Sequence, residues 1–223
     1  MRTKSSLWHF VSLPSLRFQI AFFGLVGSLL SIAHSASALE VARVFVFPVG
    51  NEWKAPGEGN EYVVIGGYCV WDAAQGGYHT GVDLSNGQEG GAVKAIAVGD
   101  VVRKTTGYSG GWGNSIVIRH LLPNGEYWCS RYAHLQDNSI TVNVGDLVQI
   151  GQTIGLVGST GLSSQPHLHL QITEGPEDPA YIPNAPCAMY GYPDPLKFIR
   201  DRLAAPLATE PSTWGHVKSL YRQ

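Results

Sequence analysis

The stretch His167-Leu168-His169-Leu170-Gln171-Ile172 alternates polar and apolar side chains more regularly than its surroundings. Such alternation predicts a strand with one buried face. Alternate residues of a strand share a face, so His167 and His169 are expected side by side, about 6.6 Å apart along the backbone. Two imidazoles at that spacing suit one metal ligand and one neighbour that faces the metal-bound water.

A second segment, His79-Thr80-Gly81-Val82-Asp83, adds a histidine and a carboxylate. A catalytic zinc typically takes three His or carboxylate ligands and leaves a fourth position to water. Regular strand geometry would separate His79 from Asp83 by roughly 13 Å, so we expect a turn at Thr80-Gly81, with Gly81 in an unusual backbone conformation. His79, Asp83 and one histidine of the 167–169 pair then supply three ligands, and the spare histidine can act as a base.

The region from 40 to 175 consists of short β segments separated by Gly, Asn and Asp. Their β-branched and aromatic content predicts an all-β fold with an antiparallel sheet. The expected strands are 42–47, 62–66, 92–104, 115–119, 127–132, 153–157 and 167–173.

Two stretches, 95–102 and 140–148, resemble each other as a strand, a Gly-Asp turn and a second strand. This duplication favours a core like the barrel-sandwich hybrid, built from a duplicated hybrid motif. One short C-terminal helix is expected at about Pro195–Leu203, with Asp194 as its N-cap.

Residues 1–38 have the pattern of a signal peptide, with a basic start, an apolar run and the small residues Ala36-Ser37-Ala38. The run is shorter than the roughly 20 residues of a membrane-spanning helix; an uncleaved anchor is the alternative. We therefore expect export to the periplasm or the extracellular cell wall, with no stable membrane anchor after cleavage. Residues 39–60 would lead into one domain at 61–204, and 205–223 would form a loosely held tail.

Without the leader, the charge balance becomes acidic. Removing its three basic residues leaves 12 Lys and Arg against 17 Asp and Glu, a net charge of −5. A nucleic-acid surface needs a basic stripe, so no nucleic-acid partner is expected.

Three cysteines, Cys69, Cys129 and Cys187, have spacings that match no cysteine-based zinc motif. Export permits a disulfide, but an odd count leaves at least one cysteine without a partner in the chain. We favour Cys69 with Cys187, because Cys129 lies within an expected strand; three buried thiols are the alternative.

Several other residues have two interpretations. The long loop at 174–193, rich in proline, follows the expected strand 167–173 and could form one side of the site. The aromatic residues Tyr78, Trp112 and Tyr132 could line a peptide cleft or belong to the core. His120, at the end of an expected strand, is assigned to structure.

Four motifs in order carry a family resemblance: His-Thr-Gly-Val-Asp-Leu at 79–84, Gly-Trp-Gly-Asn-Ser-Ile-Val-Ile-Arg-His at 111–120, Tyr-Ala-His-Leu at 132–135 and Pro-His-Leu-His-Leu at 166–170. Over about residues 60–200 the chain resembles the lysostaphin-type (LytM-like) zinc metallopeptidases, which cut peptide bonds in bacterial peptidoglycan. The domain at 61–204 would then be a zinc metallopeptidase domain.

The resemblance implies that His79, Asp83 and His169 bind one Zn²⁺. It implies that His167 is the catalytic general base beside a zinc-activated water, and that His134 is a second active-site histidine that stabilises the oxyanion. The partners would be peptidoglycan peptide stems and cross-links. Whether the bond lies in a glycine bridge or a D-amino-acid cross-link, and whether a regulatory protein controls the site, stay open.

Three alternatives compete with this hypothesis. A catalytically silent or partner-activated domain could act as a binding or regulatory module of cell-wall hydrolysis, although all five site residues are present. Two histidines and one carboxylate also form the facial triad of iron oxygenases, but the spacing of His79 and Asp83 differs from the usual His-x-Asp. A lipoyl or biotinyl carrier is rejected, since neither Lys94 nor Lys104 lies at a hairpin tip.

Overall fold

The protein is described by a computed structural model over residues 39–73, 76–107, 110–177, 187 and 191–203. The predicted signal peptide and the tail at 205–223 lie outside the described residues, as does most of the loop at 174–193.

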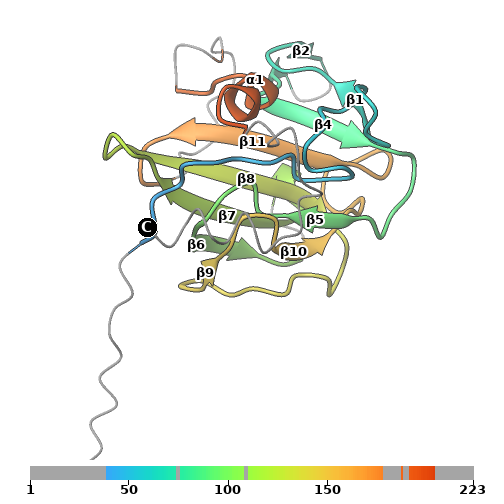
Figure 1. The fold of residues 1–223 in the computed structure, drawn as a ribbon. Coiled ribbons are helices and arrows are strands. Elements are labelled where there is room, and N and C mark those ends of the chain that lie inside the picture. Colours follow the sequence, from blue (N-terminus) through green and yellow to red (C-terminus); the bar gives the residue numbers. More distant parts are fainter. Residues whose placement is uncertain (1–38, 74–75, 108–109, 178–186, 188–190, 204–223) are drawn as a thin grey trace, which may run out of the picture. The chain divides into compact units, whose positions relative to one another are not determined.

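The fold is all-β and antiparallel, with one short helix, as predicted (Figure 1). The strands are β1 (Val63–Gly66), β2 (Trp71–Asp72), β3 (Gly77–Tyr78), β4 (Gly81–Ser85), β5 (Ala92–Lys94), β6 (Gly99–Thr105), β7 (Asn114–Leu121), β8 (Tyr127–Leu135), β9 (Leu147–Val148), β10 (Thr153–Leu156) and β11 (Leu168–Glu174). The 3-10 helix η1 (Gly110–Trp112) precedes β7, and α1 (Pro195–Arg200) follows β11.

Seven strands form the main sheet in the order β1-β4-β11-β8-β7-β6-β9. Strand β11 lies between β4 and β8 and pairs antiparallel with both. The sheet therefore brings the segments around residues 83, 133 and 169 together, although they are far apart in the sequence. Two smaller pairs, β5 with β10 and β2 with β3, complete the described strands.

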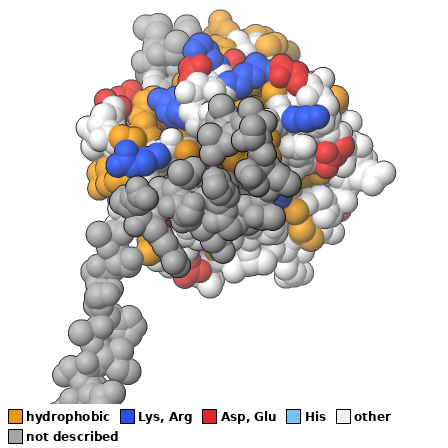
Figure 2. Space-filling model, viewed as in Figure 1, with side chains coloured by type: hydrophobic (Ala, Val, Ile, Leu, Met, Phe, Trp, Pro, Cys, Tyr) orange, Lys and Arg blue, Asp and Glu red, His pale blue; other side chains and the backbone are white. Residues whose placement is uncertain are grey.

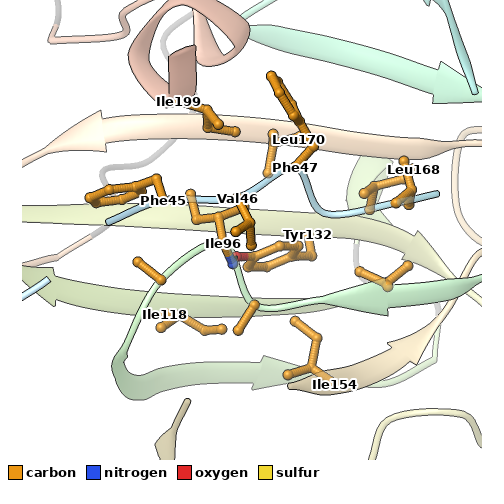
Figure 3. Packing of buried hydrophobic residues seen from close by; sticks show 14 of the residues in the cluster. Phe45, Val46, Phe47, Ile96, Ile118, Tyr132, Ile154, Leu168, Leu170 and Ile199 are labelled. Carbon is orange, nitrogen blue, oxygen red and sulfur yellow. Dashed lines mark hydrogen bonds between the residues drawn. The ribbon is translucent and has the colours of Figure 1, made fainter. Parts of the chain in front are cut away.

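One face of the main sheet carries the hydrophobic core. Figure 3 shows Leu168 and Leu170 of β11 in the same cluster as Phe45, Phe47 and Ile96. Burying these apolar side chains is the main favourable contribution to folding. Because side chains alternate along a strand, His169, between Leu168 and Leu170, must face the other side of the sheet.

Two expected strands differ from the structure. The segment 92–104 is divided into β5 and β6, because Ile96 N donates to the Tyr132 hydroxyl oxygen (2.8 Å) instead of a strand partner. The segment 42–47 forms only one isolated bridge, at Phe45, although most of its apolar side chains are buried. In both places many of the apolar side chains are buried, but the expected continuous strand was wrong.

Other elements agree in part with the sequence. Asp194 caps α1 by accepting hydrogen bonds from Leu196 N (2.9 Å) and Lys197 N (3.2 Å). Of the two expected Gly-Asp turns, Gly145 lies in a turn just before β9, but Gly99-Asp100 begins strand β6 and is not a turn. The strands β6 and β9 are neighbours in the main sheet. The duplicated hybrid motif itself stays a prediction.

The cysteines pair as favoured. Cys69 and Cys187 form a disulfide, and Cys129 is a buried free thiol.

The surface in view has charged side chains of both signs close together (Figure 2). Among the described residues, no helix has the length and apolar character needed to cross a membrane.

Candidate metal centre

Asp83 and His169 are brought together by the central strands. They are direct partners across β4 and β11, and His169 Nδ1 lies 2.9 Å from Asp83 Oδ1. Leu168 and Leu170 point into the core, so His169 lies on the opposite face of the sheet. The alternation seen in the sequence thus places one donor nitrogen beside one carboxylate.

His79 reaches this pair from the segment just before β4. Its Nε2 lies 3.1 Å from Asp83 Oδ1 and 2.9 Å from His169 Nδ1. Its Nδ1 donates to the carbonyl oxygen of Gly67 (2.8 Å). A carbonyl oxygen only accepts, so Nδ1 holds the ring proton and Nε2 presents a lone pair to the cluster.

The expected role of Gly81 was wrong. Gly81 is the first residue of β4 and does not have a positive φ, and no turn occurs at Thr80-Gly81. A Cβ there would lie 2.3 Å from Leu170 O and 2.7 Å from His169 Nε2. Glycine is needed at this position because the neighbouring strand and the imidazole approach closely.

The three donor atoms fit a zinc ion. Tetrahedral zinc with bonds of about 2.0–2.1 Å has donor atoms roughly 3.3 Å apart, and the observed separations are 2.9–3.1 Å. His169 Nε2 is buried without a hydrogen-bond partner in the described part of the chain, so Nδ1 is the ring nitrogen that faces the other two donors. Two imidazole nitrogens and one carboxylate oxygen that converge in this way form a typical zinc donor set.

The protonation of the cluster reflects the same proximity. Burial acts to raise the pKa of Asp83, but His169 and His79 hold that pKa well below its ordinary value. Burial lowers the pKa of His169 to about 4, against the opposing effect of Asp83. For Asp83 and His169 these directions favour a charged carboxylate beside a neutral imidazole, which are the forms that bind a metal. Burial acts to lower the pKa of His79, but Asp83 raises it above its ordinary value.

His167 lies just before β11 and faces the same cluster. Its Nδ1 donates to the carbonyl oxygen of Gln165 (2.8 Å), so Nε2 is the nitrogen with the lone pair in the neutral ring. This Nε2 is 3.6 Å from Asp83 Oδ1. An imidazole nitrogen of His167 therefore lies close to the carboxylate of the cluster.

His134, near the end of β8, completes the group. Its ring centroid is 4.6 Å from that of His167, and its Nδ1 donates to Thr160 O (2.8 Å). Burial and the neighbouring His167 lower the pKa of His134 to about 4. Its φ of 59° is rare for a residue with a side chain and often marks a functional position.

All five histidine and aspartate residues singled out in the sequence thus lie in one place. Sequence reasoning missed the groups that orient them, which are the backbone carbonyls of Gly67, Thr160 and Gln165. Any residue type supplies a carbonyl, so the sequence contains no signal for these partners.

The aromatic residues have different locations. Trp112 lies 5.0 Å from the His169 ring, between centroids, and the Arg131 guanidinium carbon lies 4.7 Å from the Trp112 ring centroid. Tyr132 belongs to the core, and Tyr78 packs edge to face on Trp71. Of the three aromatic candidates, Trp112 is therefore the one that adjoins the donor cluster.

Comparison with known proteins identifies one family. Residues 77–179 match the model described as Peptidase family M23. This match includes His79, Asp83, His134, His167 and His169.

The chain is similar to parts of three longer proteins. It is 44% identical over 96 residues to lysostaphin of Staphylococcus simulans, covering 43% of this chain and 18% of that protein. It is 43% identical over 93 residues to the DD-carboxypeptidase/endopeptidase Mpg of Neisseria meningitidis, covering 42% and 19%. It is 37% identical over 124 residues to the murein hydrolase activator NlpD of Escherichia coli, covering 54% and 27%.

The solved structure of the antimicrobial peptidase lysostaphin from Staphylococcus simulans is also similar. It is 30% identical with a TM-score of 0.50, and the match covers 68% of this chain and 55% of that chain. The matched region has the same fold.

Proposed function

Because the chain belongs to peptidase family M23 through residues 77–179, we propose that it is a zinc metalloendopeptidase that hydrolyses peptide cross-links of bacterial peptidoglycan. One observation carries the proposal. The donor atoms of His79, Asp83 and His169 lie within hydrogen-bond distance of one another. The rings of two further histidines, His167 and His134, lie close to this cluster.

His79, Asp83 and His169 would hold the zinc ion through Nε2, Oδ1 and Nδ1. When bound, zinc supplies a Lewis acid that polarises the scissile carbonyl and lowers the pKa of a water ligand to about 7. The carbonyl of Gly67 keeps the proton of His79 on Nδ1, so that Nε2 is available for the metal.

His167 is the proposed general base. Its Nδ1 proton is engaged by Gln165 O, so Nε2 can accept a proton from the attacking water and pass it to the leaving amine. The distance of 3.6 Å between this nitrogen and Asp83 Oδ1 supports the role.

His134 is the proposed second active-site histidine. Its Nδ1 proton is engaged by Thr160 O, so the neutral ring presents an acceptor at Nε2. His134 becomes a donor to a developing oxyanion once Nε2 is protonated. The ring of His167, 4.6 Å away between centroids, adds to the effect of burial in lowering the pKa of His134.

The substrate class rests on the relatives. Mpg is a DD-carboxypeptidase/endopeptidase and lysostaphin is an antimicrobial peptidase, which supports cleavage of cell-wall peptides by this chain. Export through the signal peptide at 1–38 would place the protein in the periplasm or the cell wall. Peptidoglycan stems and cross-links are therefore the proposed partners.

A second candidate function is activation of another cell-wall hydrolase. The similarity to the murein hydrolase activator NlpD supports this candidate. In that case the chain would bind a regulatory partner, and its own cleft would be silent or would open only in the complex.

One experiment distinguishes the endopeptidase from the activator. Purified peptidoglycan is incubated with the full chain, with a chelator, with zinc added back, and with the variants His167→Ala and Asp83→Ala, and products are read by mass spectrometry. Endopeptidase activity predicts zinc-dependent release of uncross-linked peptides, lost in both variants, while zinc binding is lost only in Asp83→Ala. If the wild-type protein binds zinc tightly but leaves the peptidoglycan intact, the result would contradict the proposed endopeptidase activity and favour the activator function.

A further inference from the structure

The position of His79 depends on one short segment, residues 67–70. His79 N donates to Val70 O (2.8 Å), and His79 O accepts from Cys69 N (2.7 Å). The ring is held by the same segment, since Nδ1 donates to Gly67 O (2.8 Å). Backbone and imidazole of this donor residue are thus both oriented by residues 67–70.

The segment lies between strands β1 and β2, so ladder hydrogen bonds of the main sheet do not fix it. Two links connect it instead to Cys187 and Tyr192. Cys69 forms the disulfide with Cys187, across a sequence separation of 118 residues, and the Tyr68 hydroxyl donates to Tyr192 O (2.5 Å). Cys187 O in turn accepts from Tyr192 N (3.2 Å), which joins the two anchor points.

The disulfide also contacts His79 itself. Cys187 Sγ lies 3.6 Å from the carbonyl oxygen of His79. Cys187 is almost fully buried, at 1% exposed. Cys69 has a φ of 58°, a conformation that persists only where surrounding contacts impose it. The covalent bond, the strained residue and the donor residue therefore form one packed unit.

We propose that the Cys69–Cys187 disulfide positions His79 as a metal ligand, so that the metal site reaches its full affinity only in the disulfide-bonded chain. The disulfide touches neither the metal nor the substrate, and it acts through the 67–70 segment. This inference rests on the zinc site of the proposed function and adds to it a positioning element that the two cysteines supply.

The test measures zinc affinity in the absence of any substrate. The full chain is purified with its disulfide formed, and its zinc dissociation constant is determined by competition with a chromogenic chelator. The double variant Cys69→Ala/Cys187→Ala is compared with Cys129→Ala, which removes a cysteine that is as buried as Cys187 but lies on β8, outside the 67–70 segment. The free energy of unfolding of each zinc-free protein is measured in parallel.

The double variant should bind zinc about 10- to 100-fold more weakly, the usual cost of losing a group that orients a ligand. Cys129→Ala should keep the wild-type affinity. A disulfide that only stabilises the fold would lower the free energy of unfolding and leave the affinity of the folded protein unchanged, and that result would overturn the proposal.

A second variant covers the case in which the double variant fails to fold. Tyr68→Phe removes the other link from the segment to residue 192 and keeps the disulfide. It should weaken zinc binding less than the double variant does. If Tyr68→Phe keeps the wild-type zinc affinity, and the double variant does so as well where it folds, the positioning role is contradicted. A wild-type chain that binds no zinc would refute the proposed metal site as well. Zinc binding by the wild type thus distinguishes failure of the positioning role from failure of the metal site.

Discussion

Gly66 lies directly against the carboxylate of Asp83. The two residues are partners across β1 and β4, and a Cβ on Gly66 would lie 2.3 Å from Asp83 Oδ2. Contacts under 3.0 Å are essentially never seen for real Cβ atoms, so the edge strand β1 can lie this close to the carboxylate of Asp83, a proposed metal ligand, only because residue 66 has no side chain.

The substitution Gly66→Ala should therefore displace Asp83 and weaken zinc binding by about 10- to 100-fold, as for other changes that disturb a ligand's surroundings. Zinc affinity by chelator competition is the measurement. Gly155→Ala is the matched control, because its added Cβ would meet its nearest neighbour, Leu135, at an ordinary 3.4 Å. Wild-type zinc affinity in Gly66→Ala would show that the carboxylate can move without cost.

His134 combines a proposed catalytic role with a left-handed backbone, at φ 59°. Both His134→Asn and His134→Ala should lose at least about 100-fold in peptidoglycan cleavage, the typical contribution of a positioned proton-transfer group. Asn tolerates this backbone conformation better than Ala, so His134→Asn should have the higher free energy of unfolding of the two. Zinc affinity should be retained in both variants, and a loss of zinc would indicate that His134 is a ligand.

Two buried tyrosines differ in whether the hydroxyl has a hydrogen-bond partner. The Tyr132 oxygen accepts from Ile96 N (2.8 Å), whereas the Tyr62 hydroxyl is buried without a hydrogen-bond partner among the described residues. Tyr132→Phe leaves a buried N–H unsatisfied and should lower the free energy of unfolding by about 1–3 kcal/mol. Tyr62→Phe should leave that free energy unchanged or raise it. Urea denaturation measures both, and equal losses would refute the argument.

His120 makes stability depend on pH. It is buried between Val98 O and Ser130 Oγ, and burial lowers its pKa to about 4. The unfolded chain, with an ordinary histidine pKa near 6.5, binds the proton more readily between pH 6.5 and 4. The free energy of unfolding should therefore fall as the pH falls through this window, by about 2 kcal/mol from pH 7 to pH 5 for this residue.

The comparison of wild type with His120→Gln isolates this effect, because other histidines titrate in both proteins. Urea denaturation of the zinc-free proteins at pH 7 and pH 5 should give the smaller pH dependence for His120→Gln. Equal pH dependence in the two proteins would mean that His120 is protonated in the native state without loss of stability.

Much of the fold followed from local patterns. Alternation around His169 predicted β11, Asp194 and Pro195 predicted the start of α1, and turn residues predicted an antiparallel all-β fold. The division of 92–104 into two strands was missed, because Ile96 N pairs with a tyrosine side chain distant in sequence. Strand β4 was also absent from the expected strands, since its short run contains the site residue Asp83.

The sequence by itself determined which residue types can meet a metal and on which side of one strand, because a period of two is a local property of the chain. Only the tertiary structure decided how His79 reaches Asp83, which nitrogen of each imidazole faces the cluster, and why residues 66 and 81 are glycines. These features depend on backbone carbonyls and close approaches between strands. They arise when distant segments pack together, and no local pattern of side chains encodes them.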